Sequence, residues 1–114
     1  MSEPIIWHNP RCSKSRQTLA ILEEAGLQPA IVRYLEDSPT EAELRAALKL
    51  LGVGPKEIIR ESEAVYKELG LRGATDDALI AAMAAHPILI ERPVVFHKGK
   101  AALGRPPESV LDIL

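Results

Sequence analysis

Short apolar runs alternate along the chain with longer stripes at helical spacing. Ile5–Trp7 is a run of the kind that forms a buried strand, and the segment 31–35 is a second one. Between them Leu19 and Leu22 lie on one helical face, and Gly26 stands where the residue after a helix belongs. Because one helix separates the two strands, we expect them to be parallel and joined by a right-handed crossover.

The middle of the chain carries helical patterns only and predicts a helical insertion. Thr40 and Glu43 form a capping-box pattern ahead of an apolar stripe that ends at Gly52. The other helices expected here cover 55–60, 63–69 and a longer segment from the Thr75 cap to His86.

The last part of the chain predicts a β-hairpin followed by a short helix. Strand patterns over 93–97 and 101–103 flank a tight-turn signal, so these strands should pair antiparallel, with His97 and Lys98 solvated at the turn. Pro107 then opens the last helix, at a position that tolerates proline. The order βαβ, helical insertion, ββα predicts a single thioredoxin-like α/β domain over residues 1–114.

Composition narrows the class of protein. The 114 residues, 46% hydrophobic and 26% charged, are those of a globular domain. A net charge of −2 and 4% aromatic residues argue against nucleic-acid binding. No apolar run approaches the roughly 20 residues that cross a membrane. We expect a protein of the reducing cytoplasm, because the chain has one cysteine, and no bound metal, because no ligand spacing is present. We also expect a monomer.

That cysteine, Cys12, follows a strand and begins a helix. Unpaired N–H groups and the helix dipole at such a position stabilise a thiolate and attract oxyanions. Arg11, Lys14 and Arg16 are expected to add positive charge, and so would a protonated His8. Alternatively, His8 takes no part in the chemistry and simply packs against the loop or caps it. Polar neighbours on both sides predict that Cys12 is not buried.

Two nearby residues exclude familiar kinds of thiol site. Ser15, rather than a second cysteine, stands three residues after Cys12, so this is not a CxxC dithiol, and the Ser15 hydroxyl is expected to donate to the thiolate. Thr18 stands where the Cys-x5-Arg loop of tyrosine phosphatases has arginine. What remains is a monothiol with an oxyanion site beside it.

The motif His8-Asn9-Pro10-x-Cys12-x-x-Ser15-Arg16 resembles the signature of the glutaredoxin-coupled arsenate reductase family. Further similar segments follow in order: Tyr34-Leu35-Glu36, Tyr66-x-x-Leu69-Gly70-Leu71, His86-Pro87-Ile88-Leu89-Ile90-x-Arg92-Pro93 and Gly104-Arg105-Pro106. Ser13 in place of glycine, and a chain that ends after its last helix, resemble the shorter, less characterised branch of that family.

The resemblance implies a fold, a reaction and partners. The fold would be thioredoxin-like, of the glutaredoxin type, with a mixed sheet and a helical insertion. Cys12 would attack arsenate as the nucleophile, glutathione would then attack the arsenic, and glutaredoxin would reduce the mixed species so that arsenite leaves. The protein would hold no bound cofactor, because glutathione acts as a co-substrate.

The resemblance also assigns three arginines and Pro93 to the site, and the residues around Cys12 supply the other expected members. Arg60, Arg92 and Arg105 would hold the oxyanion, and His8 would assist Cys12. The residues expected to bind the oxyanion or stabilise the thiolate are Ser13, Ser15, Arg16 and Pro93, the last in a cis peptide that faces the thiol.

Each arginine has a simpler interpretation. Arg60 lies among acidic residues and could form an ordinary solvated ion pair. Arg92 and Arg105 lie beside proline and glycine in loops, which makes them better candidates for the planar, bidentate recognition of an oxyanion. Two other functions stay open: a thiol transferase with another acceptor, and a protein-binding regulator of RNA polymerase, against which the absence of CxxC argues.

Overall fold

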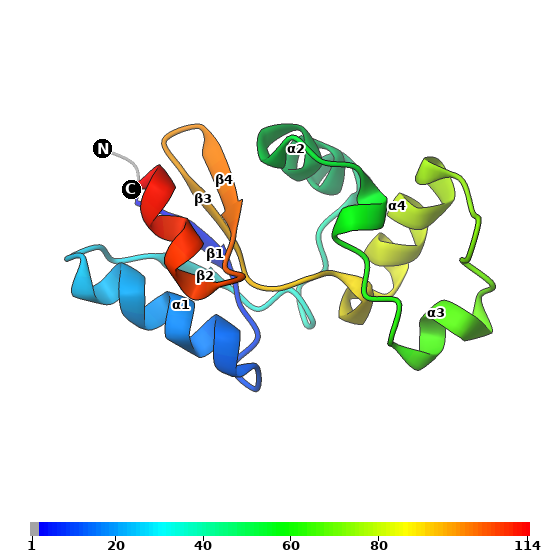
Figure 1. Cartoon of the computed structure of the whole chain (residues 1–114), viewed down its shortest axis with the longest axis horizontal. Coiled ribbons are helices and arrows are strands. Elements are labelled where there is room, and N and C mark those ends of the chain that lie inside the picture. The colour runs from blue at the N-terminus through cyan, green and yellow to red at the C-terminus, as the bar shows by residue number, and fades with distance from the viewer. Residues whose placement is uncertain (1–2) are drawn as a thin grey trace. The chain divides into compact units, whose positions relative to one another are not determined.

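The computed structural model describes residues 3–114, and these divide into two compact units. Residues 3–37 and 92–114 form the sheet unit, and residues 38–91 form the helical unit (Figure 1). The helical unit is the insertion that the sequence predicts. The prediction of one domain over residues 1–114 begins outside the described residues and stays a prediction.

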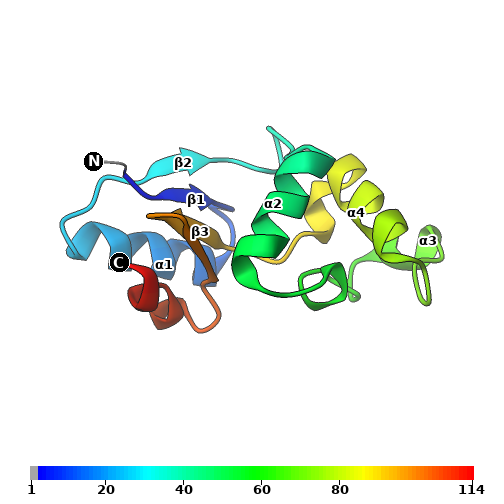
Figure 2. The same cartoon turned by 90° about the horizontal axis from the view of Figure 1, so that it is seen from above.

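A four-stranded mixed sheet organises the sheet unit (Figure 2). Its strands are β1 (Ile5–Trp7), β2 (Ala30–Val32), β3 (Val94–His97) and β4 (Lys100–Leu103), in the order β2-β1-β3-β4. β1 is parallel to β2 and antiparallel to β3, which is antiparallel to β4. The predicted parallel βαβ unit and the predicted hairpin are both confirmed.

Helix α1 (Ser13–Glu24) crosses from β1 to β2 and packs on one face of the sheet together with a 3₁₀-helix at Pro107–Ile113 (Figure 2). Gly26 has a left-handed φ of 83°, and the Leu27 N–H donates to the Leu22 carbonyl at 3.1 Å. This is the predicted glycine-terminated helix end. The core of the unit consists of Ile6, Leu22, Val95, Val110 and Ile113.

The hairpin turn contains only Lys98 and Gly99, with φ of 52° and 74°. Positive φ at both positions gives the twist that suits a two-residue hairpin. His97, however, is 6% exposed, and its Nδ1 lies 2.9 Å from the Ile113 carbonyl. The prediction that His97 is solvated is wrong, because His97 shares a face of β3 with Val95 and so faces the core.

The helical unit contains α2 (Glu41–Leu51), α3 (Ala64–Glu68) and α4 (Asp76–Ala85), with 3₁₀-helices at Pro55–Glu57 and Pro87–Leu89. The Thr40–Glu43 capping box is present, and Thr75 caps α4 by accepting from the Ala78 N–H at 3.2 Å. His86 is the C-cap of α4, as predicted. None of the helices within residues 3–114 has the length and apolar character that crossing a bilayer demands.

Three predicted elements differ in extent. The second strand ends at Val32 rather than at residue 35, because the N–H groups of Glu36 and Asp37 turn back to the Arg33 carbonyl at 3.0 and 2.9 Å. The pieces predicted over 55–60 and 63–69 are shorter and cover Pro55–Glu57 and Ala64–Glu68. Strand and helix patterns do not show these local turns, since the turns depend on backbone hydrogen bonds.

Candidate thiol site

The sheet register places three distant segments at one end of the sheet. Trp7 pairs with Val94, and Val94 pairs with Leu103. The segment that leaves β1 toward Cys12, the segment that enters β3 and the segment that leaves β4 therefore meet at the same end of the sheet. These three segments carry Cys12, Arg92 and Arg105.

A tight loop holds Cys12 at the start of α1. The Cys12 N–H donates to the Asn9 carbonyl at 3.0 Å, and the Arg11 N–H donates to Asn9 Oδ1 at 3.0 Å. Cys12 itself is the N-cap, with extended φ of −94° and ψ of 123°, and its carbonyl accepts from the Arg16 N–H at 3.0 Å. Its side chain therefore stands where the unpaired N–H groups of the helix are exposed.

Opposing effects set the acidity of the thiol. Burial would raise the pKa of Cys12, but a hydrogen bond from the Ser15 backbone N–H, the positive charge of Arg92, the Lys14 N–H and the Arg92 side chain together lower it below the ordinary thiol value. The net direction favours the thiolate, which is the nucleophilic form of cysteine.

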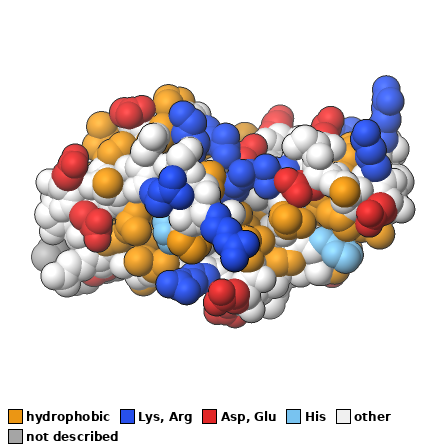
Figure 3. Space-filling view, turned by 90° about the horizontal axis from the view of Figure 1, so that it is seen from below, with side chains coloured by type: hydrophobic (Ala, Val, Ile, Leu, Met, Phe, Trp, Pro, Cys, Tyr) orange, Lys and Arg blue, Asp and Glu red, His pale blue; other side chains and the backbone are white. Residues whose placement is uncertain are grey.

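Cys12 is only 8% exposed, so the prediction that its polar neighbours keep it unburied is wrong. Arg92 and Arg105 approach it from the far end of the chain, which local sequence does not show. The positive charge that lowers the pKa of Cys12 also has a different source from the predicted one. Arg11, Lys14 and Arg16 are exposed, and their side chains are not among the groups that lower the pKa of Cys12. Figure 3 shows Lys and Arg side chains, drawn in blue, at the surface of the protein.

Arg92 and Arg105 lie together beside the thiol. Arg105 Nη2 lies 3.9 Å from Cys12 Sγ, and Arg105 Nε donates to the Arg92 carbonyl at 2.9 Å. Pro93 is buried, and the Arg92–Pro93 peptide is cis, as predicted. The Arg105–Pro106 peptide is also cis, which the sequence did not indicate. Two guanidinium groups next to a thiolate form a site that suits an oxyanion.

His8 and Ser15 form a buried pair behind the thiol. Ser15 Oγ lies 2.7 Å from His8 Nδ1 and accepts from the Asn9 N–H at 3.0 Å. The hydroxyl is thus held by His8 and Asn9, and the prediction that it donates to the thiolate is wrong. The backbone N–H of Ser15 interacts with the thiol instead.

Of the two roles left open for His8, the cationic one depends on its protonation. Burial, followed by the charges of Arg33 and Arg16, lowers the pKa of His8 below its usual value. The protonated, positively charged form of His8 is therefore disfavoured relative to a free imidazole, which favours the packing role over the cationic one. His8 contacts Ser15 in the first turn of α1, and its predicted assistance to Cys12 stays a prediction.

For the remaining predicted residues, the structure gives a position but no contact with the Cys12 side chain. Arg16 Nη1 donates to the Pro10 carbonyl at 3.0 Å, so its guanidinium makes a hydrogen bond within the loop. Ser13 is exposed at the first position of α1. Arg60 belongs to the helical unit, where its guanidinium pairs with Glu63 at 2.8 Å. The ion pair that offered the simpler interpretation of Arg60 is therefore present, and its role in an oxyanion clamp stays a prediction.

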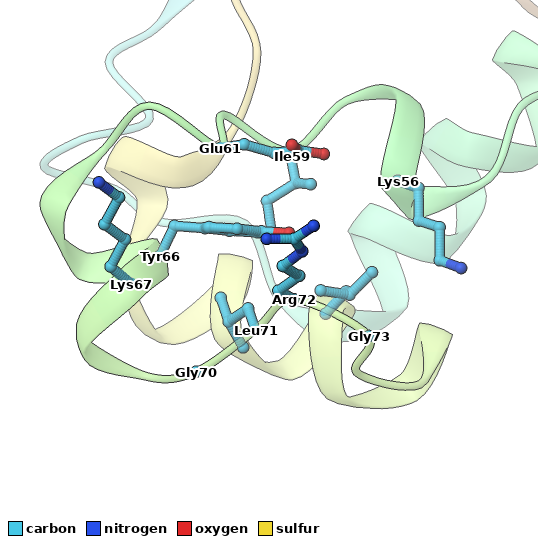
Figure 4. Close-up of a pocket in the computed structure, with 10 residues that line it drawn as sticks. Lys56, Ile59, Glu61, Tyr66, Lys67, Gly70, Leu71, Arg72 and Gly73 are labelled. Atoms are coloured by element: carbon cyan, nitrogen blue, oxygen red, sulfur yellow. The ribbon is translucent and has the colours of Figure 1, made fainter.

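A cavity of about 650 Å³ lies wholly within the helical unit and contains none of the predicted site residues (Figure 4). Lys56 and Lys67 stand on opposite sides of it, with Tyr66 and Arg72 between them. Within residues 3–114, no three His, Cys, Asp or Glu side chains are grouped so that they could hold a metal ion.

The fold and the site define a thioredoxin-like protein with one buried, acidified thiol beside two arginines. The model of the ArsC family matches residues 7–113, and the chain belongs to the ArsC family. The predicted family resemblance and the predicted thioredoxin-like fold, a mixed sheet with a helical insertion, are thereby confirmed.

Similar proteins cover nearly the whole chain. The chain is 45% identical over 117 residues to an arsenate reductase of Neisseria meningitidis, spanning 100% of both sequences. It is 51% identical to the uncharacterized protein YfgD of Escherichia coli K12, over 96% of this chain and 94% of that protein. The solved structure of an arsenate reductase from Vibrio cholerae superposes with a TM-score of 0.94 at 52% identity, covering 97% of each chain.

The lowered pKa of Cys12 predicts early alkylation. As an acid with a depressed pKa, the thiol is ionised at a lower pH than a free cysteine, so the rate of reaction with iodoacetamide should reach its midpoint at a lower pH in the folded protein than in the unfolded chain. The urea-unfolded chain is the control, because its one thiol should titrate at the ordinary value. A folded-state midpoint at or above that of the unfolded chain would show that the site does not acidify Cys12.

Proposed function

We propose that this chain is a glutathione- and glutaredoxin-dependent arsenate reductase, with the Cys12 thiolate as its nucleophile. The observation that carries the proposal is the acidified thiol at the start of α1, 3.9 Å from a guanidinium nitrogen of Arg105 and beside Arg92. Arsenate is a tetrahedral oxyanion, and guanidinium groups donate paired hydrogen bonds to such anions. The arsenate reductases among the relatives support the same substrate.

The first half of the reaction builds two sulfur–arsenic bonds. The Cys12 thiolate attacks the arsenic, and one arsenate oxygen leaves as water. The thiol of glutathione attacks next, and a second oxygen leaves as water. Arsenic is still pentavalent at this stage, bridged between Cys12 and glutathione, with Arg92 and Arg105 facing its remaining oxygens.

The second half moves two electrons. A glutaredoxin thiolate attacks the glutathione sulfur and forms a mixed disulfide, while the electron pair of the broken sulfur–arsenic bond stays on arsenic, which becomes trivalent. Water then displaces Cys12 from the arsenic, which releases arsenite and restores the thiol. Oxidation of two thiols to a disulfide balances the reduction of arsenic.

The arginines are proposed to act together. Arg92 has two tasks, since its charge also lowers the pKa of the nucleophile. Arg105 is tied to the Arg92 carbonyl and so presents its guanidinium from a fixed direction. Arg60 is included among the proposed oxyanion-binding arginines on the basis of the family resemblance alone. The reaction suits the reducing cytoplasm, where glutathione is abundant, and we propose that location and a monomeric state.

Substitution of the clamp arginines tests the site assignment. Arg92→Ala and Arg105→Ala should each lower kcat/KM for arsenate by about 10²–10³-fold, the usual effect of removing one donor to transition-state charge. Arg72→Ala, an exposed arginine of the helical unit, is the matched control. Turnover should be measured at a pH at which Cys12 is ionised in every variant. Equally mild effects from all three substitutions would mean that the clamp is misassigned.

The source of electrons gives a second test. The chain has one cysteine and cannot close an internal disulfide, so a second sulfur must come from solution. Arsenate turnover should be absent without glutathione, should increase strongly with glutaredoxin and should disappear in Cys12→Ser.

Thioredoxin, which prefers protein disulfides, should replace glutaredoxin poorly. Full multiple turnover with thioredoxin alone would contradict the mechanism. An acidified thiol without any arsenate turnover would favour the thiol transferase that acts on another acceptor.

A further inference from the structure

Gly104 lies buried directly after β4, where no side chain fits. A Cβ at this position would meet Thr18 Oγ1 and would lie 2.6 Å from Pro93 Cγ and 3.0 Å from Pro93 Cδ. At each of the other six glycines, a Cβ would meet nothing within 4 Å. Gly104 is therefore the glycine at which other parts of the chain approach the backbone closely, and the reason is space rather than a left-handed φ.

The atoms that crowd Gly104 belong to the segments that build the thiol site. Thr18 is wholly buried in α1, and its Oγ1 donates to the Lys14 carbonyl at 2.8 Å, in the turn whose N–H groups stabilise the Cys12 thiolate. Pro93 follows Arg92 directly, and its carbonyl accepts from the Gly104 N–H at 2.9 Å.

Arg105 follows Gly104 directly, so the same contact also fixes the second arginine. Its Nη2 lies 3.9 Å from Cys12 Sγ, near the outer limit for a hydrogen bond to sulfur, and its Nε holds the Arg92 carbonyl. A shift of the backbone at residue 104 would lengthen the first distance and disturb the second. Because the attraction between charges falls with distance, such a shift would weaken the support of the thiolate.

We propose that Gly104 is a positioning residue of the thiol site, which by lacking a side chain lets α1, the Arg92–Pro93 segment and Arg105 close around Cys12. No electron or proton passes through it. Its effect is exerted on the distances between the thiolate and the arginines. Its consequence for turnover rests on the proposed function, whereas its consequence for the acidity of Cys12 does not.

The test compares Gly104→Ala with Gly54→Ala. Gly54 has an ordinary φ of −92° and open space around its Cβ position, so alanine is accommodated there. Gly104→Ala should raise the midpoint pH of Cys12 alkylation by about one unit, the order expected when a charged partner moves away. It should also lower arsenate turnover by about 10²-fold, as a misplacement of about 1 Å does. Gly54→Ala should change neither quantity.

A second pair of variants guards against a simple loss of folding, which circular dichroism would detect. In Thr18→Ala/Gly104→Ala the nearest obstructing atom is gone, and the shift of the alkylation midpoint, measured relative to Thr18→Ala alone, should be smaller than in Gly104→Ala. If Gly104→Ala does not fold, the double variant carries the test, and it should fold with a raised midpoint.

Three results would overturn the proposal. These are a folded Gly104→Ala with the wild-type midpoint, equal shifts in Gly104→Ala and Gly54→Ala, and a double variant that still fails to fold, which would make Gly104 a support of the whole unit. A wild-type protein without arsenate turnover would remove the proposed function, yet a raised midpoint in Gly104→Ala would still support the positioning role.

Discussion

Burial of the Cys12 thiol opposes its ionisation, and the sheet unit is arranged so that other contacts outweigh this effect. Taking an anion out of water is unfavourable unless hydrogen bonds and a partner charge replace the water. Here the N–H groups of Ser15 and Lys14 supply the hydrogen bonds, and Arg92 supplies the charge. The fold, the conformation of the loop and the close contact at Gly104 all serve to keep these partners at short range.

The topology of the sheet brings the arginines close to Cys12. Because β1 lies next to β3 and pairs with it antiparallel, the residue that follows the end of one strand lies near the residue that precedes the other. Cys12 and Arg92 are 80 positions apart in the sequence, yet the pairing of Trp7 with Val94 brings their segments together. The β3–β4 hairpin then returns the chain to the same end of the sheet, and Arg105 follows there. The buried His8 contacts Ser15 in the first turn of α1.

Local patterns predicted much of this fold and part of the site. The caps at Thr40 and Thr75, the glycine-terminated helix and the two-residue hairpin depend on residues that are neighbours in the sequence. The burial of Cys12 and the lowered pKa of His8 depend instead on contacts between distant segments. Arg11 and Arg16 were expected to supply charge because they are close in sequence, but their side chains point to other partners or to solvent. Gly104 carried no signal beyond its place in the Gly-Arg-Pro segment, because space around a backbone is a property of the folded chain.

A distant arginine, rather than the basic residues around the loop, supplies the positive charge that stabilises the thiolate. Titration of the ultraviolet absorption of the Cys12 thiolate in Arg92→Gln and in Arg16→Gln tests this most directly. Each variant removes one positive charge, so their effects on the net charge of the protein are equal. We expect Arg92→Gln to raise the pKa of Cys12 and Arg16→Gln to leave it close to that of the wild type. An equal rise in both variants, or a rise in Arg16→Gln alone, would contradict this account.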